Sequence, residues 1–117
     1  MGYDFIGHGG FGLHILDWRP CFNLALAFGW QPLGTVAPCD WTGPKPWSGT
    51  YFTNELQEVC DDDAHALAAA LRRALAARIE RQHLTNEQKE AWANKDITVR
   101  IVRDLADYAE DGHFAIA

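Results

Sequence analysis

The segment of residues 30–48 constrains the fold most, because its composition is incompatible with a regular helix or strand. It contains four prolines and two glycines, which break regular backbone, and three tryptophans that can hold it against a core. This combination predicts an ordered, irregular loop. We expect Trp30 and Trp47 to anchor the loop and Trp41 to be its exposed ring.

One helix is predicted before this loop. Asp17 can cap it, Pro20 suits its first turn, and Gly29 can end it. Four apolar residues then share one face of it: Cys21, Leu24, Ala25 and Phe28. Residues 1–16 are rich in glycine, and within them only residues 13–16 have the composition of a short strand.

Strands are predicted at two further places, after the loop and at the C-terminal end. Residues 50–53 carry β-branched and aromatic side chains, and residues 57–60 can return as their hairpin partner. Residues 113–116 alternate in the manner of a final strand. Because every strand must satisfy its backbone amides, we expect these segments to pair in one sheet.

The clearest helix begins at the aspartates of residues 61–63, which we interpret as N-capping residues, and runs to Ile79. Acidic residues at its start and arginines toward its end favour the helix dipole. Its apolar residues recur at helical spacing: Ala64, Leu67, Ala68, Leu71, Leu75 and Ile79.

Two shorter helices are predicted next. Thr85 and Gln88 form a capping-box pattern for a polar helix that ends near Asn94. Asp96 can cap the following helix, and Gly112 can end it. The apolar stripe of this last helix faces the core: Ile97, Ile101, Leu105 and Tyr108.

These elements predict an α+β fold in one domain over residues 1–117. The chain has no internal repeat or linker, and its length is close to the commonest domain size. We expect a small antiparallel sheet of about three strands, with three to four helices packed on it.

The distribution of charge excludes one class of partner. The net charge is −6, and residues 55–117 carry thirteen acidic against eight basic side chains. Such a surface repels phosphate, because nonspecific nucleic-acid binding depends on lysine and arginine. We therefore expect no nucleic-acid partner. A basic protein partner would suit the acidic excess, but solubility is the simpler and favoured explanation.

The sequence also predicts a cytoplasmic protein that does not contact a membrane. The N-terminus lacks a basic region followed by an apolar run, and prolines and glycines interrupt the long uncharged segment of residues 20–39. Three cysteines at irregular spacing, Cys21, Cys39 and Cys60, favour free thiols in a reducing compartment. No cofactor is expected.

Several spaced segments resemble a family of small uncharacterised bacterial proteins. The matching segments are Gly29-Trp30-Gln31-Pro32-Leu33-Gly34-Thr35, Trp47-Ser48-Gly49-Thr50-Tyr51, the hairpin residues Asn54, Gln57 and Val59, and the start of the Ala/Leu-rich helix at Asp63-Ala64. Leu56 stands where such proteins usually have glycine, which argues against a tight two-residue turn there. His113 likewise replaces a second glycine. The resemblance implies a shared fold and transfers no functional site.

The candidate catalytic motifs are incomplete. Residues 7–12 have the glycine content of a phosphate-binding or oxyanion loop, but the motifs that complete such sites are missing, so a turn-rich terminal segment explains them. The histidines and cysteines show no metal-ligand spacing, and no metal is predicted. Cys39 or Cys60 could pair with a histidine as nucleophile and base, but any chain with these residue counts permits that pairing. An enzyme is therefore the less favoured class.

We interpret the chain as a noncatalytic binding or interaction protein of the inhibitor or immunity type. Its predicted contact surface combines the ring of Trp41 with an acidic helical surface at Asp104 and Asp107. The alternative is a small-ligand-binding protein or a minor enzyme, with a pocket between the aromatic loop and the glycine-rich arm. Three histidines would serve that pocket: His8, His14 and His113.

Overall fold

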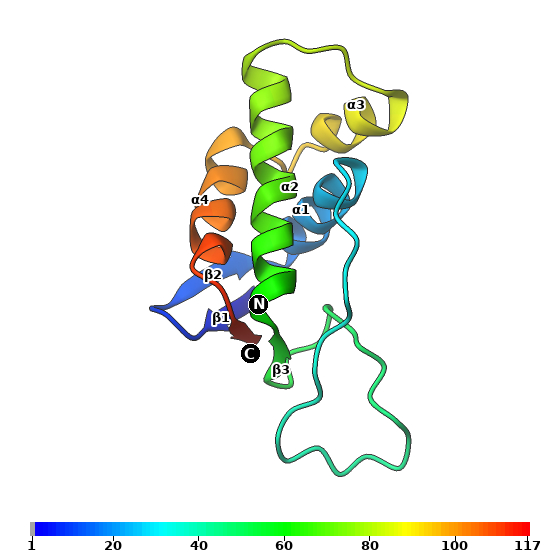
Figure 1. Ribbon diagram of the computed structural model, residues 1–117, viewed down its shortest axis with the longest axis vertical. Helices are drawn as coiled ribbons and strands as arrows, with labels where there is room; N and C mark the ends of the chain where they lie inside the picture. The colour runs from blue at the N-terminus through cyan, green and yellow to red at the C-terminus, as the bar shows by residue number, and fades with distance from the viewer. Residues whose placement is uncertain (1) are drawn as a thin grey trace.

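The computed structural model describes residues 2–117, apart from the side chains of residues 14–16, and over these residues the chain forms an α+β fold (Figure 1). The strands are β1 (Gly2–Ile6), β2 (Phe11–His14), β3 (Gln57–Val59) and β4 (Phe114–Ile116). The helices are α1 (Ile15–Ala27), α2 (Asp61–Ile79), α3 (Asn86–Ala93) and α4 (Val99–Glu110). The predicted fold class is confirmed, with a sheet of four strands where about three were expected.

The glycine-rich N-terminal arm builds one side of the sheet. All neighbouring strands are antiparallel, in the order β2-β1-β4-β3, and Tyr3 pairs with Leu13 and Phe5 with Phe11. The interpretation of residues 7–12 as a turn-rich terminal segment is therefore only partly right. They connect two paired strands, and Phe11 and Gly12 belong to the second of them.

The strand predicted at residues 50–53 is wrong. The side chain of Gln57 is fully buried, and its amide donates to the carbonyl oxygens of Thr50 (3.2 Å) and Thr53 (2.7 Å), in place of a neighbouring strand. β3 pairs instead with β4, so these two segments lie in one sheet as expected but as direct neighbours. The other edge of β3 is occupied by a single antiparallel bridge between Val36 and Glu58. The Tyr51 carbonyl accepts from Trp18 Nε1 (2.7 Å) and the Phe52 carbonyl from the Tyr3 hydroxyl (3.2 Å), so side chains bind this segment despite its high β-propensity.

The turn before β3 keeps the backbone conformation that glycine favours. Leu56 has a φ of 67°, in the left-handed region, and its side chain is 53% exposed. Its backbone N–H donates to the carbonyl of Ile116 (2.8 Å), which fixes the turn to the end of β4. A leucine thus bears the strain of a left-handed residue at the position where the family resemblance expects glycine.

The helices occur where they are predicted, with shifted starts. α1 begins at Ile15, so Asp17 lies in its first turn and does not cap it, and Pro20 lies inside the helix. Thr98, and not Asp96, caps α4, by accepting a hydrogen bond from the Ile101 amide (3.1 Å). The predicted end of α1 is confirmed, because Gly29 follows it with a φ of 98°.

Both bonds of the predicted capping box are present at the start of α3. The Thr85 amide donates to Gln88 Oε1 (3.0 Å), and the Gln88 amide donates to Thr85 Oγ1 (3.2 Å). At the start of α2 the capping prediction is wrong. The N-cap residue is Cys60, which makes no side-chain capping bond, and the aspartates of residues 61–63 occupy the first turn of the helix.

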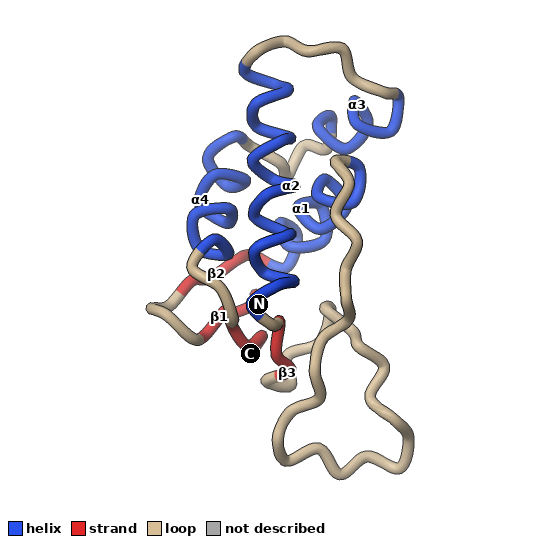
Figure 2. The backbone as a smooth tube through the Cα atoms, in the orientation of Figure 1, coloured by secondary structure: helices blue, strands red, loops and turns tan. Residues whose placement is uncertain are grey.

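The core lies between the sheet and the helices, which cover one face of the sheet (Figure 2). Along β1, Tyr3 and Phe5 are buried under the helices, whereas Asp4 and Ile6 are exposed on the opposite face. Most of the predicted α2 stripe is buried, but Ile79 at the helix end is 63% exposed. No helix in the described part of the chain is long and apolar enough to cross a membrane.

Candidate functional site

Residues 36–49 form a loop that extends beyond the sheet, away from the α2–α3 connection (Figure 1). Its two ends are joined by hydrogen bonds. The Thr35 amide donates to the Gly49 carbonyl (3.1 Å), and Thr35 Oγ1 donates to the Thr50 carbonyl (2.7 Å). The indole N–H of Trp47 donates to the same Thr35 oxygen (3.0 Å). A compact loop whose ends meet in this way is an Ω-loop, a type that often carries function.

Two glycines allow the loop to close. Gly34 has a φ of 91° and Gly49 a φ of 77°, both in the left-handed region. A Cβ atom added to Gly49 would lie 3.4 Å from the Cα atom of Gly34, at the short end of ordinary van der Waals contact. The two residues therefore combine an unusual conformation with close backbone approach, which glycine satisfies without strain.

A single buried carboxylate fixes the base of the loop. Asp63 is fully buried, and its Oδ1 accepts hydrogen bonds from Trp30 Nε1 (3.1 Å) and the Leu33 amide (3.2 Å). Its Oδ2 accepts from the hydroxyl of Tyr51, which in turn accepts from the Gly34 amide (2.9 Å). The chain is thus tied to Asp63 on both sides of the loop.

The environment of Tyr51 favours the protonated form of its hydroxyl. Burial, and then the hydrogen bond to Asp63, raise the pKa of the Tyr51 hydroxyl well above its ordinary value. The hydroxyl therefore remains a donor to the carboxylate. We interpret the network as the support of the loop, because all of its donors and acceptors satisfy one another inside the fold.

Trp41 lies toward the tip of the loop and is 40% exposed. Its ring packs edge to face against Trp47, with 4.9 Å between ring centroids, and lies over Gly43, where a Cβ atom would clash with it. Its indole N–H donates to the Lys45 carbonyl (3.3 Å). The structure thus places Trp30 in the core, Trp47 half-buried at the loop ends, and Trp41 at the surface.

The structure does not bring Trp41 together with the two predicted aspartates. Asp104 and Asp107 lie on α4, which Figure 1 shows on the other side of α2 from the loop. Asp107 is paired with Arg72 (2.6 Å), and this hydrogen bond raises the pKa of the arginine. The Oδ2 atom of Asp104 lies 3.9 Å from Nε of Arg100. The acidic surface of α4 is therefore partly neutralised and separate from the aromatic loop.

Two of the three predicted histidines lie near the turn between α4 and β4, each with its own partner. His8 Nε2 lies 3.2 Å from the carbonyl oxygen of Gly112, and its ring packs on Tyr108 with 4.2 Å between centroids. His113 Nε2 lies 2.9 Å from Glu58 Oε1. Each ring thus has a partner within the fold, although the buried Nδ1 of His8 makes no hydrogen bond. The side chain of His14 lies outside the described residues.

The three cysteines differ in their exposure to solvent. Cys21 is buried, and burial, then the nearby Asp17, raise the pKa of its thiol to about 12, so it is protonated at neutral pH. Cys39 is exposed on the loop and Cys60 is half-buried. Within the described part of the chain, no group of three or more His, Cys, Asp or Glu side chains could hold a metal ion.

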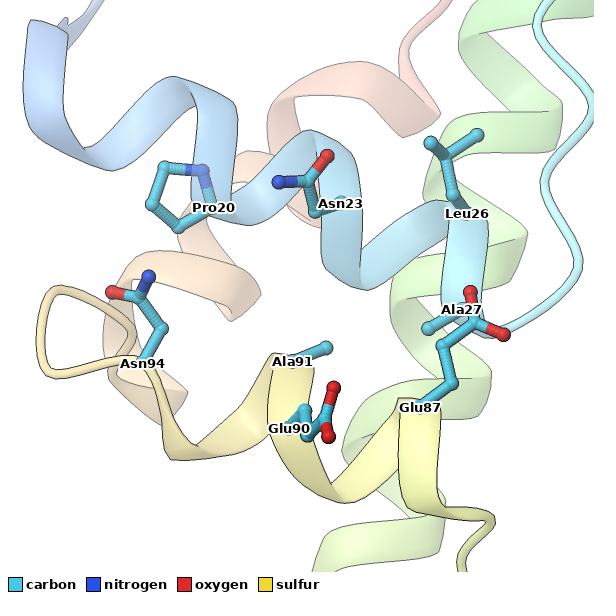
Figure 3. Close-up of a pocket in the computed structure, with 8 residues that line it drawn as sticks. All are labelled: Pro20, Asn23, Leu26, Ala27, Glu87, Glu90, Ala91 and Asn94. Atoms are coloured by element: carbon cyan, nitrogen blue, oxygen red, sulfur yellow. The ribbon is translucent and has the colours of Figure 1, made fainter.

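A groove along α1 has no counterpart in the sequence predictions (Figure 3). One hollow of 310 Å³ lies between α1 and α3, and a second of 470 Å³ lies between α1, Phe52 and the segment after α3. They share Pro20, Asn23 and Asn94 and are therefore adjacent, and we call the two hollows together the groove along α1. No local sequence pattern predicts this groove, because α1 and the residues opposite it are distant from each other in the chain.

Comparisons of the chain with protein families, curated proteins and solved structures found no match. The resemblance noted in the sequence therefore stays a prediction. The chemistry of the described residues is the basis of the following proposals.

Proposed function

We propose that the chain is a noncatalytic protein-binding protein, of the inhibitor or immunity type, that contacts its partner through the 36–49 loop. The observation that supports this most is the ring of Trp41, 40% exposed on a loop whose ends are hydrogen bonded to each other. Exposed tryptophans are the side chains that most often dominate the free energy of protein association.

The support of the loop is the second part of the argument. Association costs conformational entropy whenever a flexible segment becomes ordered. Here Pro38, Pro44 and Pro46 restrict the backbone, and the buried Asp63 network fixes the base before any partner is present. A partner would therefore meet an ordered surface. Most of the contact energy would then contribute to affinity.

The test begins with affinity capture from the native host and identification of the captured protein by mass spectrometry. Binding of the purified partner is then measured for Trp41→Ala and for Ile79→Ala, a control that truncates an exposed apolar side chain at the far end of α2. We expect Trp41→Ala to weaken binding by about 2 kcal/mol or more, which is about 30-fold in affinity. Ile79→Ala should bind like the original chain.

Thermal unfolding of both variants checks that the fold is retained. If Trp41→Ala folds normally and binds with unchanged affinity, the contact surface lies elsewhere and the proposal is wrong. If Trp41→Ala unfolds, the ring is a packing residue of the loop, which also contradicts the proposal.

A further inference from the structure

The groove along α1 is already formed in the free chain. The side-chain amide of Gln88 on α3 donates to the carbonyl of Ala27 at the end of α1 (3.2 Å), which fixes the distance between the two helices. Trp92, on α3, is buried, with the guanidinium of Arg78 stacked on its ring at 4.6 Å. The two walls of the groove are thus joined by a direct hydrogen bond, and Arg78 on α2 also contacts α3 through Trp92.

The surface of the groove is partly apolar and partly amide. Pro20, Ala27 and Ala91 line it, and Leu26, at 39% exposure, forms part of its rim. Asn23 lies on the α1 side and Asn94 opposite it (Figure 3). Asparagine side chains can both donate to and accept from the main chain of an extended peptide.

The charged side chains of the groove are mostly negative. Glu87 and Glu90 project from α3 toward α1 (Figure 3), and Asp96 lines the second hollow. Within the described part of the chain, none of these three carboxylates has an ion-pair partner. Arg19 is the cation that lines the groove, and its guanidinium lies over the ring of Phe52, 3.9 Å from the centroid.

We propose that this groove binds a basic, extended segment of another polypeptide. A lysine or arginine of the segment would lay its aliphatic stem along Ala27 and Ala91 and place its charged group between Glu87 and Glu90. From Pro20 to Ala27, α1 rises by about 10 Å, which is the length of about three extended residues. Phosphate-bearing ligands would be repelled by the same carboxylates.

This site is separate from the 36–49 loop, so it can be tested without knowledge of the loop's partner. The probe is a fluorescein-labelled octapeptide of alternating alanine and lysine, with an alanine and glutamate peptide as its counterpart. Binding is measured by fluorescence anisotropy at low and physiological salt. Amide chemical shifts recorded by NMR locate the bound peptide on the chain.

Two variants remove different features of the groove. Glu87→Gln with Glu90→Gln removes its charge, and Asn23→Trp fills it without a change of charge. The matched control is Asp62→Asn with Asp104→Asn, which removes the same charge from exposed positions outside the groove. We expect each groove variant to weaken binding of the lysine peptide at least tenfold and the control to weaken it less than twofold. Shift changes should concentrate on α1 and α3.

Three results would overturn the proposal. If the control weakens binding as much as the Glu87→Gln and Glu90→Gln variant does, the affinity of the peptide depends only on the net charge of the protein. If Asn23→Trp binds normally, the peptide does not occupy the groove. The proposal is also wrong if the glutamate peptide binds as well as the lysine peptide. Trp41→Ala should leave peptide binding unchanged, so failure of the loop proposal and failure of the groove proposal are distinguishable.

Discussion

Replacement of Asp63 by alanine tests whether one buried carboxylate supports the whole 36–49 loop. The side chain is fully buried and accepts hydrogen bonds from Trp30, Leu33 and Tyr51. Alanine offers no acceptor, so the indole N–H and the phenol O–H would both be left buried without a partner. The Leu33 amide is only partly buried, and water can replace its acceptor.

The expected loss of stability follows from these donors. A buried donor that loses its acceptor costs about 1–3 kcal/mol, so the two buried donors together predict a loss of about 2–6 kcal/mol for Asp63→Ala. Domains of this size have a free energy of unfolding of about 5–15 kcal/mol. Tyr51→Phe removes one of the donors, so in a double-mutant cycle with Asp63→Ala the combined loss should be smaller than the sum of the single losses.

The assay is urea unfolding followed by far-UV circular dichroism, which is independent of changes in tryptophan fluorescence. Asp62→Ala is the matched control, because Asp62 is the exposed neighbour of Asp63 in the same helical turn and should cost at most about 1 kcal/mol. The reasoning is refuted if Asp63→Ala and Asp62→Ala have the same stability. Strict additivity in the cycle with Tyr51→Phe would show that the two residues do not act together.

Two further predictions concern the backbone and the core. Leu56→Gly should raise the free energy of unfolding by about 1 kcal/mol, because it relieves the strain of a leucine in the left-handed region at φ 67°. Leu33→Gly is the control at an exposed position with an ordinary φ, and it should lower the free energy of unfolding. Equal losses of stability in the two variants would contradict the prediction. Burial raises the pKa of the Cys21 thiol in the folded chain above its unfolded value near 9. The stability that depends on the protonated thiol is therefore complete below pH 9. It is lost as the pH rises from 9 toward 12, by about 1.4 kcal/mol for each pH unit. Urea unfolding between pH 8 and pH 10.5 should give a shallower alkaline loss for Cys21→Ala than for the original chain, and identical slopes would contradict the burial argument.

The helices could be predicted because their signals are local. The Thr85–Gln88 capping box needs only residues three apart, and the stripe of Leu67 and Leu71 needs only helical spacing. The start of α4 was misplaced for the same reason. Asp96 and Thr98 are both good capping residues two positions apart, and nothing local distinguishes them.

The strands were harder to predict because their partners are distant in sequence. β1 pairs with β4, more than a hundred residues away, and this pairing turns isolated apolar residues in a glycine-rich arm into the centre of a sheet. Residues 50–53 show the opposite case. Their local propensity favours a strand, but their carbonyl groups accept hydrogen bonds from the side chains of Gln57, Trp18 and Tyr3.

The support of the loop did leave a signal in the sequence, and it shows how such sites can be found. The three aspartates of residues 61–63 look alike as a helix start, but Asp63 lies four residues before Leu67 and so shares the buried face of α2. A carboxylate on a buried face needs hydrogen-bond donors. Tryptophan and tyrosine supply them best, because each buries an aromatic ring together with an N–H or O–H group. Trp30 and Tyr51, on either side of an irregular loop, are such residues. An acidic residue within the apolar stripe of a helix therefore predicts that donors from a neighbouring loop bind its carboxylate. The groove along α1 offers no such pattern, because its lining residues are exposed to water and need no partner within the fold.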